Sequence, residues 1–367
     1  MGQIRLFLCG DVMTGRGIDQ ILLHPSEPAI HEHYVQTALA YVQLAEKKNG
    51  PIPRSVDPTY IWGDAMPELD RVRPAARVVN LETAVTRSND WLDKGINYRM
   101  NPSNIACLTA TGIDCCALAN NHVLDWGASG LMETLDTLHA AGLKTAGAGK
   151  NQLQAEAPAV VPVGDGQRLL IFSLGAESSG VPHSWAATER APGVAVLADL
   201  SRHTVERIAR NVRSVRQAQD IVIASVHWGS NWGYGISPAE VQFAHELIEH
   251  AGVDLFHGHS SHHPKGLEVF CGKLIIYGCG DFINDYEGIA GHESFRGDLA
   301  CMYFPTLDTD SGQLLGLEVV PLQAKRFRLQ GATQTDASWL CSTLDRESRR
   351  FATSAILRAG QRIVFEW

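Results

Sequence analysis

Short apolar runs rich in β-branched residues recur along the chain, and most of them end in a cluster of Gly, Asn, His or Asp. Runs of this length and composition are typical of buried β-strands. Six of them are Arg5–Cys9, Arg77–Leu81, Asp114–Ala119, Ile221–Val226, Val253–Phe256 and Leu274–Tyr277. Helical patterns lie between several of them, at Leu131–Ala141, Ser201–Gln217 and Ser237–Ala251. This alternation predicts an α/β fold of layered β-sheets flanked by helices, with mostly parallel central strands.

The chain has 367 residues, which is enough for one large domain with a peripheral extension or for two small domains. From about Gly312 onward, strand and turn signals alternate, followed by a helical pattern at Asp336–Arg350 and a last strand pattern at Gln361–Glu366. We therefore expect a catalytic domain over residues 1–310. Residues 311–367 are expected to form a C-terminal strand and helix extension that packs on the same domain.

Charge and composition narrow the classes to which the protein can belong. The net charge is −9 at pH 7 and the pI is about 5.9, which disfavours general binding to nucleic acid or to an anionic membrane. No apolar run approaches the ~20 residues of a spanning helix, and the run over residues 3–9 is too short for a secretion signal. The eight cysteines include no Cys-x-x-Cys pair, so we expect most of them to be buried. We expect a cytoplasmic protein with no nucleic-acid partner and no membrane association.

Polar clusters follow the predicted strands, at the sheet edge where sites form in α/β proteins. They are Gly10-Asp11-Val12-Met13, Asn80-Leu81-Glu82, Asn120-Asn121-His122 with Asp125, His227-Trp228-Gly229, Gly258-His259 with His262 and His263, and Gly278-Cys279-Gly280-Asp281-Phe282. Any one of them is unspecific, because a lone Asp after a strand usually caps a helix. Together they bring carboxylate, amide and imidazole groups to one edge, which suits a divalent metal. The pattern leaves Ca, Mn, Mg and Zn open.

The order of these motifs resembles that of the calcineurin-like metallophosphoesterases, with their Asp-x-His, Gly-Asp-x-x-Asp, Gly-Asn-His-Asp/Glu, His and Gly-His-x-His motifs. The chain is still more similar to the CapA-like branch of that superfamily, which is associated with poly-γ-glutamate capsule synthesis. The shared motifs are Gly-Asp-Val-Met, Asn-Leu-Glu, Asn-Asn-His, His-Trp-Gly and Gly-His with a His three residues on. They span residues 10–282, about three-quarters of the chain. The resemblance implies the calcineurin-like metallophosphoesterase fold and a metal-dependent enzyme.

The resemblance also implies which residues hold a metal. The ligands of one metal in the superfamily match four residues here: Glu82, Asn121, His227 and His259. A second metal would need Asp11, His262 and the His of Asp-x-His, but Met13 stands at that last position. A thioether is a poor ligand for a hard divalent ion. We therefore expect one principal divalent ion per chain.

Two histidine–carboxylate pairs are expected beside this ion. The resemblance assigns His122 as a catalytic acid or base, and Asp125 is placed to orient its ring. Asp11 and His262, freed from holding a second metal, would form the other pair. An alternative for His262 is that it binds only a water or a retained metal ion.

Several functions are compatible with this site. We favour proton transfer at the Cα of a peptide, in which one base removes the proton and the other delivers one to the opposite face. A branch of this fold epimerises the C-terminal residue of ribosomal lasso-peptide precursors, which supports a peptide epimerase. The alternatives are a metal-dependent phosphoesterase or hydrolase, which the missing histidine at Met13 disfavours, a CapA-like role in capsule synthesis, and a binding module without catalysis.

A peptide or another carboxylate-bearing molecule is the expected substrate. The Arg99 guanidinium is suited to binding a carboxylate, and Lys265, which flanks the motifs, is a second candidate. The Trp228 ring could contact an apolar side chain of the substrate. For each of the three, a surface or core role is the alternative. We also expect Asp281 to orient His257 or His259 from outside the ligand set.

Overall fold

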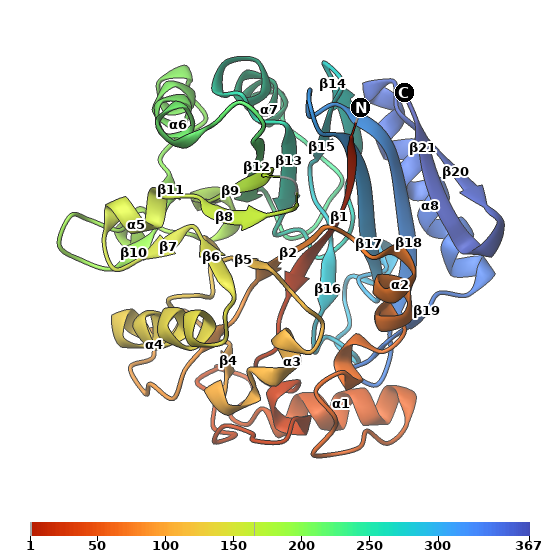
Figure 1. The fold of residues 1–367 in the computed structure, drawn as a ribbon. Coiled ribbons are helices and arrows are strands. Elements are labelled where there is room, and N and C mark those ends of the chain that lie inside the picture. The colour runs from red at the N-terminus through yellow and green to blue at the C-terminus, as the bar shows by residue number, and fades with distance from the viewer. Residues whose placement is uncertain (1, 165) are drawn as a thin grey trace.

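Two large sheets form the centre of the protein, for which a computed structural model describes residues 2–164 and 166–367 (Figure 1). The first sheet is ten-stranded, with the order β20-β21-β18-β17-β1-β2-β5-β6, and β16 and β19 pair with β1 and β18. Its strands are β1 (Gln3–Val12), β2 (Ala76–Leu81), β5 (Cys115–Ala117), β6 (Lys144–Ala146), β16 (Asp281–Ile283), β17 (Leu299–Asp308), β18 (Leu314–Ala324), β19 (Leu329–Gly331), β20 (Ser354–Arg358) and β21 (Arg362–Glu366).

The second sheet is seven-stranded, with the order β11-β9-β12-β13-β15-β14 and β8 beside β9. Its strands are β8 (Ala159–Pro162), β9 (Arg168–Ala176), β11 (Val196–Leu197), β12 (Ile221–His227), β13 (Leu255–His259), β14 (Leu267–Phe270) and β15 (Lys273–Ile276). Two short pairs join β3 (Ala84–Val85) to β4 (Arg99–Met100) and β7 (Ala148–Gly149) to β10 (Gly193–Val194). The central strands β1, β2, β5 and β6 run parallel, as do β9, β12, β13 and β15, as the sequence predicted.

Both faces of β1 are buried from Leu6 to Val12, which explains why apolar residues occupy successive positions there. In β1, Leu6 and Leu8 lie in a core between the two sheets, whereas Phe7 and Cys9 pack on the opposite face. This is the alternation that the pleat of a strand imposes. The outer face of the second sheet packs against α6 (Arg202–Val215) and α7 (Pro238–Ala251) in a third core (Figure 1). The helices of the described chain are α1 (Leu39–Asn49), α2 (Ala65–Val72), α3 (Ala106–Thr109), α4 (Gly127–Ala140), α5 (Gln152–Glu156), α6 (Arg202–Val215), α7 (Pro238–Ala251) and α8 (Gln334–Ser348).

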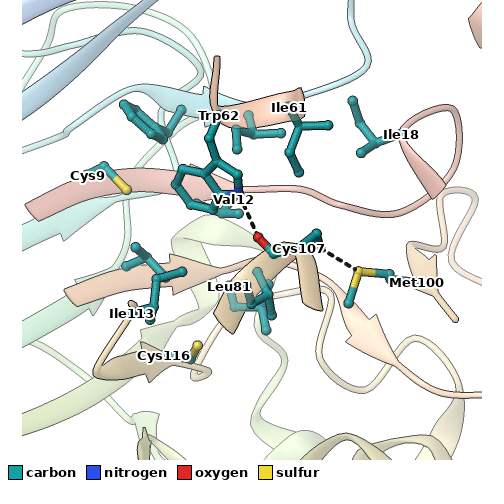
Figure 2. Packing of buried hydrophobic residues seen from close by; sticks show 14 of the residues in the cluster. Cys9, Val12, Ile18, Ile61, Trp62, Leu81, Met100, Cys107, Ile113 and Cys116 are labelled. Atoms are coloured by element: carbon teal, nitrogen blue, oxygen red, sulfur yellow. Dashed lines mark hydrogen bonds between the residues drawn. The ribbon is translucent and has the colours of Figure 1, made fainter. Parts of the chain in front are cut away.

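The core outside the first sheet is built around Trp62 (Figure 2). The Trp62 Nε1 donates a hydrogen bond of 2.7 Å to the Cys107 carbonyl, and the Cys107 Sγ lies 3.5 Å from the Met100 Sδ. Cys9 and Cys116 are buried in the same cluster. Cysteine serves here as a small apolar side chain, as we expected from the sequence.

The C-terminal residues extend the first sheet rather than forming a sheet of their own. Strand β18 pairs antiparallel with β17, and β21 pairs with β18. The predicted boundary at residue 310 falls in the turn between β17 and β18, so both predicted parts contribute to one sheet. Among the described residues, no helix is both long enough and apolar enough to cross a bilayer.

A close contact between β1 and β16 holds two carboxylates of the site side by side. Asp11 and Asp281 are paired in register, and a Cβ added at Gly10 would lie 1.7 Å from the Gly280 carbonyl oxygen. Gly10→Ala is therefore expected to lower the free energy of unfolding by about 3 kcal/mol, because the strands must separate. Urea unfolding followed by circular dichroism measures this change. Gly316→Ala, with open space at the added Cβ, should stay within about 0.5 kcal/mol of wild type, and equal effects would contradict the prediction.

Candidate functional site

The carboxyl ends of strands from both sheets meet at one edge of the protein, and the predicted polar clusters lie there. His227 ends β12 and is in register with His259, which ends β13 in the second sheet. Asp11 comes from β1 of the first sheet, and Asp281 begins β16 beside it. The Ser260 amide donates a 3.1 Å hydrogen bond to the Asp11 Oδ2, which ties the two sheets together. Motifs far apart in the sequence therefore form one site.

Asp11, His227 and His259 are grouped like the ligands of a metal ion. One ligand atom from each lies within 4.8 Å of the others, and all three residues are buried. The Nδ1 atoms of the two imidazoles are 2.8 Å apart, and the His259 Nδ1 is 3.8 Å from the Asp11 Oδ1. Two nitrogens and a carboxylate oxygen are ligand atoms that suit a divalent metal ion.

Glu82 and Asn121 lie on the other side of the His227 ring. The Asn121 Oδ1 is 2.9 Å from the His227 Nε2, and the Glu82 Oε1 is 3.8 Å from the same nitrogen. The second oxygen, Glu82 Oε2, is buried and has no hydrogen-bond partner among the described residues. A buried carboxylate oxygen without a partner is costly unless a cation compensates it. The four predicted ligands are thus neighbours, but His259 and Asn121 contact opposite nitrogens of the His227 ring, and the role of the four as ligands of one ion remains a prediction.

Carboxylates crowd this buried region. Burial, together with the Asp281 charge, raises the pKa of Asp11 to about 7. Burial and the Asp11 and Asp281 charges also raise the pKa of Glu82 well above its usual value. A divalent cation would stabilise the charged forms of both groups. The donor set and the unpartnered Glu82 oxygen therefore fit a bound divalent metal.

His262 pairs with Asp281, and our prediction that it pairs with Asp11 is wrong. The His262 Nδ1 lies 2.9 Å from the Asp281 Oδ1, and the other Asp281 oxygen accepts a 2.8 Å hydrogen bond from Asn284. Asp11 instead accepts a 2.7 Å hydrogen bond from the Asn80 side chain. Burial alone would lower the pKa of His262, but the Asp281 carboxylate outweighs it, so this pKa is raised.

Met13 fills the position where the resemblance places a ligand histidine. Its side chain is buried, and its sulfur lies 3.7 Å from the Tyr286 hydroxyl. Asp11, His262 and Asp281 still offer three ligand atoms within 4.8 Å of one another on this side of the site. Asp281, at the start of β16, therefore supplies a ligand-type oxygen on the side of the site where Met13 supplies none. The motifs in the sequence did not predict this.

His122 and Asp125 form the other pair. The His122 Nδ1 is 2.7 Å from the Asp125 Oδ2, and its Nε2 is 3.6 Å from the Glu82 Oε1. The Lys94 ammonium lies 2.7 Å from the Asp125 Oδ1, and no motif in the sequence marked this lysine. Burial lowers the pKa of His122 to about 4. The Asp125 carboxylate opposes this shift, and the Lys94 ammonium adds to it. The geometry is that of an oriented imidazole, and its catalytic role remains a prediction.

Two tyrosines that sequence reasoning missed stand between the two histidines. The Tyr98 ring meets His122 edge-on at 4.4 Å, and the Tyr286 ring meets His262 edge-on at 5.2 Å. The Tyr98 hydroxyl donates a 3.0 Å hydrogen bond to the Tyr286 hydroxyl. Tyr98 adjoins Arg99, the residue that we singled out instead. The tyrosine pair thus connects the two histidine–carboxylate pairs.

Trp228 and Lys265 do not face the site, and our prediction that they bind substrate is wrong. Trp228 is buried, its ring packs 4.7 Å from that of Phe256, and its Nε1 donates to the Tyr277 carbonyl at 3.0 Å. Lys265 is also buried, with its ammonium 3.4 Å from the Gly235 carbonyl. Both side chains belong to the supporting structure.

Arg99 contacts neighbouring residues, and its role in substrate binding remains a prediction. Its guanidinium lies over the Trp126 ring at 4.0 Å and donates a 3.0 Å hydrogen bond to the Ser88 carbonyl. These contacts hold the planar group within the protein.

His257 lies behind His259, one of the predicted ligands, but without the carboxylate that we expected. The two rings share the Ser225 hydroxyl, at 3.1 Å from the His257 Nδ1 and 2.9 Å from the His259 Nε2. The other His257 nitrogen is 2.8 Å from the Cys9 carbonyl. Our prediction that Asp281 orients His257 or His259 is wrong, because Asp281 is used by His262.

The comparison with known families agrees with this geometry. A model described as bacterial capsule synthesis protein PGA_cap matches residues 5–286, which include the strands and clusters described above. The chain belongs to the PGA_cap family. The mixed α/β architecture is accordingly the calcineurin-like fold of that family, and the predicted fold class is confirmed.

Relatives of this PGA_cap protein carry names that refer to polymer synthesis. It is 47% identical to a probable polyglutamine synthesis accessory protein of Mycobacterium tuberculosis strain H37Rv, over 97% of this chain and 94% of the relative. It is 26% identical to the PGA biosynthesis protein CapA of Bacillus subtilis, over 75% of this chain and 62% of the relative. The capsule biosynthesis protein CapA of Bacillus anthracis is also 26% identical, over 53% and 45%.

Proposed function

We propose that this protein is a metal-dependent accessory enzyme of polyglutamate or polyglutamine synthesis that performs acid–base chemistry on a peptide chain. The names of the relatives support the pathway, because they refer to polyglutamine synthesis, PGA biosynthesis and capsule biosynthesis. The observation that carries the chemistry is a set of two histidine–carboxylate pairs beside one buried group of metal-type ligands. Two oriented imidazoles provide two positions for proton transfer.

In this proposal, different residues of the chain bind the metal and transfer the protons. Glu82, Asn121, His227 and His259 would hold the ion, and a bound divalent ion would supply positive charge to offset an oxyanion on the substrate. His122, oriented by Asp125, moves a proton on one side of the tyrosine pair, and His262, oriented by Asp281, moves one on the other side.

The second candidate is the peptide epimerase that we favoured from the sequence, and the two pairs are the observation in its favour. In that reaction one imidazole takes the Cα proton and the other returns a proton to the opposite face, so that no atom is gained or lost overall. Cleavage of the peptide chain would use the same two groups on a water and on the leaving amine.

One experiment compares these outcomes. The metal-supplemented protein is incubated in heavy water with α-linked and γ-linked glutamate oligomers. Mass spectrometry then follows Cα deuterium and chain length, and chiral chromatography follows the configuration. We expect a metal-dependent change in one of these measures that His122→Ala and His262→Ala each abolish. Turnover of generic aryl phosphodiesters with no change in any peptide would reject the proposal in favour of a phosphoesterase.

A further inference from the structure

A cavity of about 340 Å³ lies next to the His262–Asp281 pair, outside the group of metal-type ligands. Three of its lining residues contact this pair. The Trp232 ring lies 5.3 Å from that of His262, the Tyr286 ring lies 5.2 Å from it, and Asn284 donates its 2.8 Å hydrogen bond to Asp281. A molecule in this cavity would therefore contact the side chains that pack against the proposed proton-transfer group, because Trp232, Asn284 and Tyr286 line the cavity and His262 does not. Cavities of this size hold small ligands or a few residues of a peptide.

The carboxylates of the cavity lining are already used by the protein. Glu287 accepts hydrogen bonds from the Asn49 side chain at 2.5 Å and from the Arg326 and Phe327 amides at 2.8 and 2.6 Å. The other two carboxylates are also hydrogen-bonded: Asp298 by Arg296 and Gln323, and the exposed Glu293 by the Gly291 amide.

Two ammonium groups of the lining have no such partner. Lys48, in the last turn of α1, and Lys325, after β18, make no ion pair within 4.0 Å in the part of the chain that the structure describes. The wall near them is aliphatic, from Ile289, Ala290 and Ala324. The lining also carries the Glu287, Glu293 and Asp298 carboxylates, and backbone hydrogen bonds together with the Lys48 charge lower the pKa of Glu293. The cavity therefore combines two ammonium groups outside ion pairs with apolar surface, without a net positive charge. This combination is suited to carboxylates carried on methylene groups.

We propose that this cavity is a subsite for an oligoglutamate chain, with Lys48 and Lys325 binding side-chain carboxylates and Trp232 and Tyr286 guiding the chain to His262. The subsite deepens the proposed function and rests on it for the reaction at His262. Binding itself requires only the cavity and its two lysines. Charge on the ligand and aliphatic spacing are both needed, so an uncharged chain of the same length binds more weakly.

Isothermal titration calorimetry with metal-supplemented protein tests this subsite. The probes are α-linked and γ-linked triglutamate, with triglutamine as the uncharged control. We expect Lys48→Gln and Lys325→Gln each to raise the Kd for triglutamate about five-fold, the upper range for an exposed ion pair, and the double variant to raise it about 25-fold if the sites are independent. Added salt should weaken the wild-type complex. Lys47→Gln is the matched control, because Lys47 neighbours Lys48 on α1 but does not line the cavity.

Binding that is equal for triglutamate and triglutamine, or unchanged in the double variant, would overturn the subsite. These outcomes are distinct from failure of the proposed function. If the oligomers are processed with the same KM in wild type and the double variant, the subsite is rejected although the proposed enzymatic activity is supported. If triglutamate binds through both lysines but no peptide is changed, the subsite stands and the proposed reaction is rejected.

Discussion

Replacement of His227 by alanine is expected to remove nearly all of the bound divalent metal, whereas replacement of His122 is expected to leave it in place. The His227 ring is central to the ligand group, with its Nδ1 2.8 Å from the His259 Nδ1 and its Nε2 2.9 Å from the Asn121 Oδ1. Loss of this imidazole removes a direct ligand, so we expect the metal affinity to fall by about 100-fold or more. His122 instead directs its Nδ1 to Asp125.

Metal analysis of protein purified without chelator, expressed as ions per chain, measures this difference. Thermal unfolding gives a second measure, because a metal that binds only the folded state raises the Tm of wild type and should not raise that of His227→Ala. Equal metal loss in both variants would mean that His122 is a ligand. Two tightly held ions in wild type would mean that the Asp11, His262 and Asp281 group also binds metal, against the single ion that we predict.

The sequence was sufficient to locate the strands and the edge where the site lies. Apolar runs and the polar residues that follow them are local signals, and a parallel sheet brings the carboxyl ends of its strands to one edge. Strands β12 and β13 therefore deliver His227 and His259 to the same place. The prediction needed no knowledge of how the two sheets pack, since both sets of strand ends reach the same edge.

The partners of these residues depended on contacts that no local pattern records. Gly10 lets β16 approach β1, which places Asp11 and Asp281 in register, and the His262 ring pairs with Asp281 of the two. Trp228 follows His227 directly in the sequence. Successive side chains of an extended segment point to opposite sides, so Trp228 enters the core when His227 faces the site. That alternation was available from the sequence and should have excluded Trp228.

Lys94 is a residue near the site that the sequence did not predict. It lies in an irregular segment, 31 residues before Asp125, yet its ammonium is 2.7 Å from that carboxylate. A long loop carries no periodicity from which its position can be inferred. Such residues are found only once the fold has brought the loop to the site.

Asp281→Asn is expected to reduce the reaction on glutamate oligomers by about 10²- to 10⁴-fold, while metal content stays at the wild-type level. The Asp281 carboxylate orients the His262 ring through its 2.9 Å contact and stabilises the charged imidazole. Asparagine has nearly the same shape but cannot supply that charge. Asp125→Asn should act in the same way on His122, whose Nδ1 is 2.7 Å from the Asp125 Oδ2.

The heavy-water assay and metal analysis, applied to the same preparations, separate this role from metal binding. Asp70→Asn, at an exposed position in α2, is the control and should match wild type in both measures. If Asp281→Asn loses its metal along with its activity, Asp281 is a metal ligand and the His262–Asp281 pair is not an acid–base unit. If activity and metal content are both unchanged, the Asp281 carboxylate is not needed and the His262–Asp281 pair does not act as an acid–base unit. Loss of activity with the metal retained, in both the Asp281 and the Asp125 variants, is the result that two oriented imidazoles require.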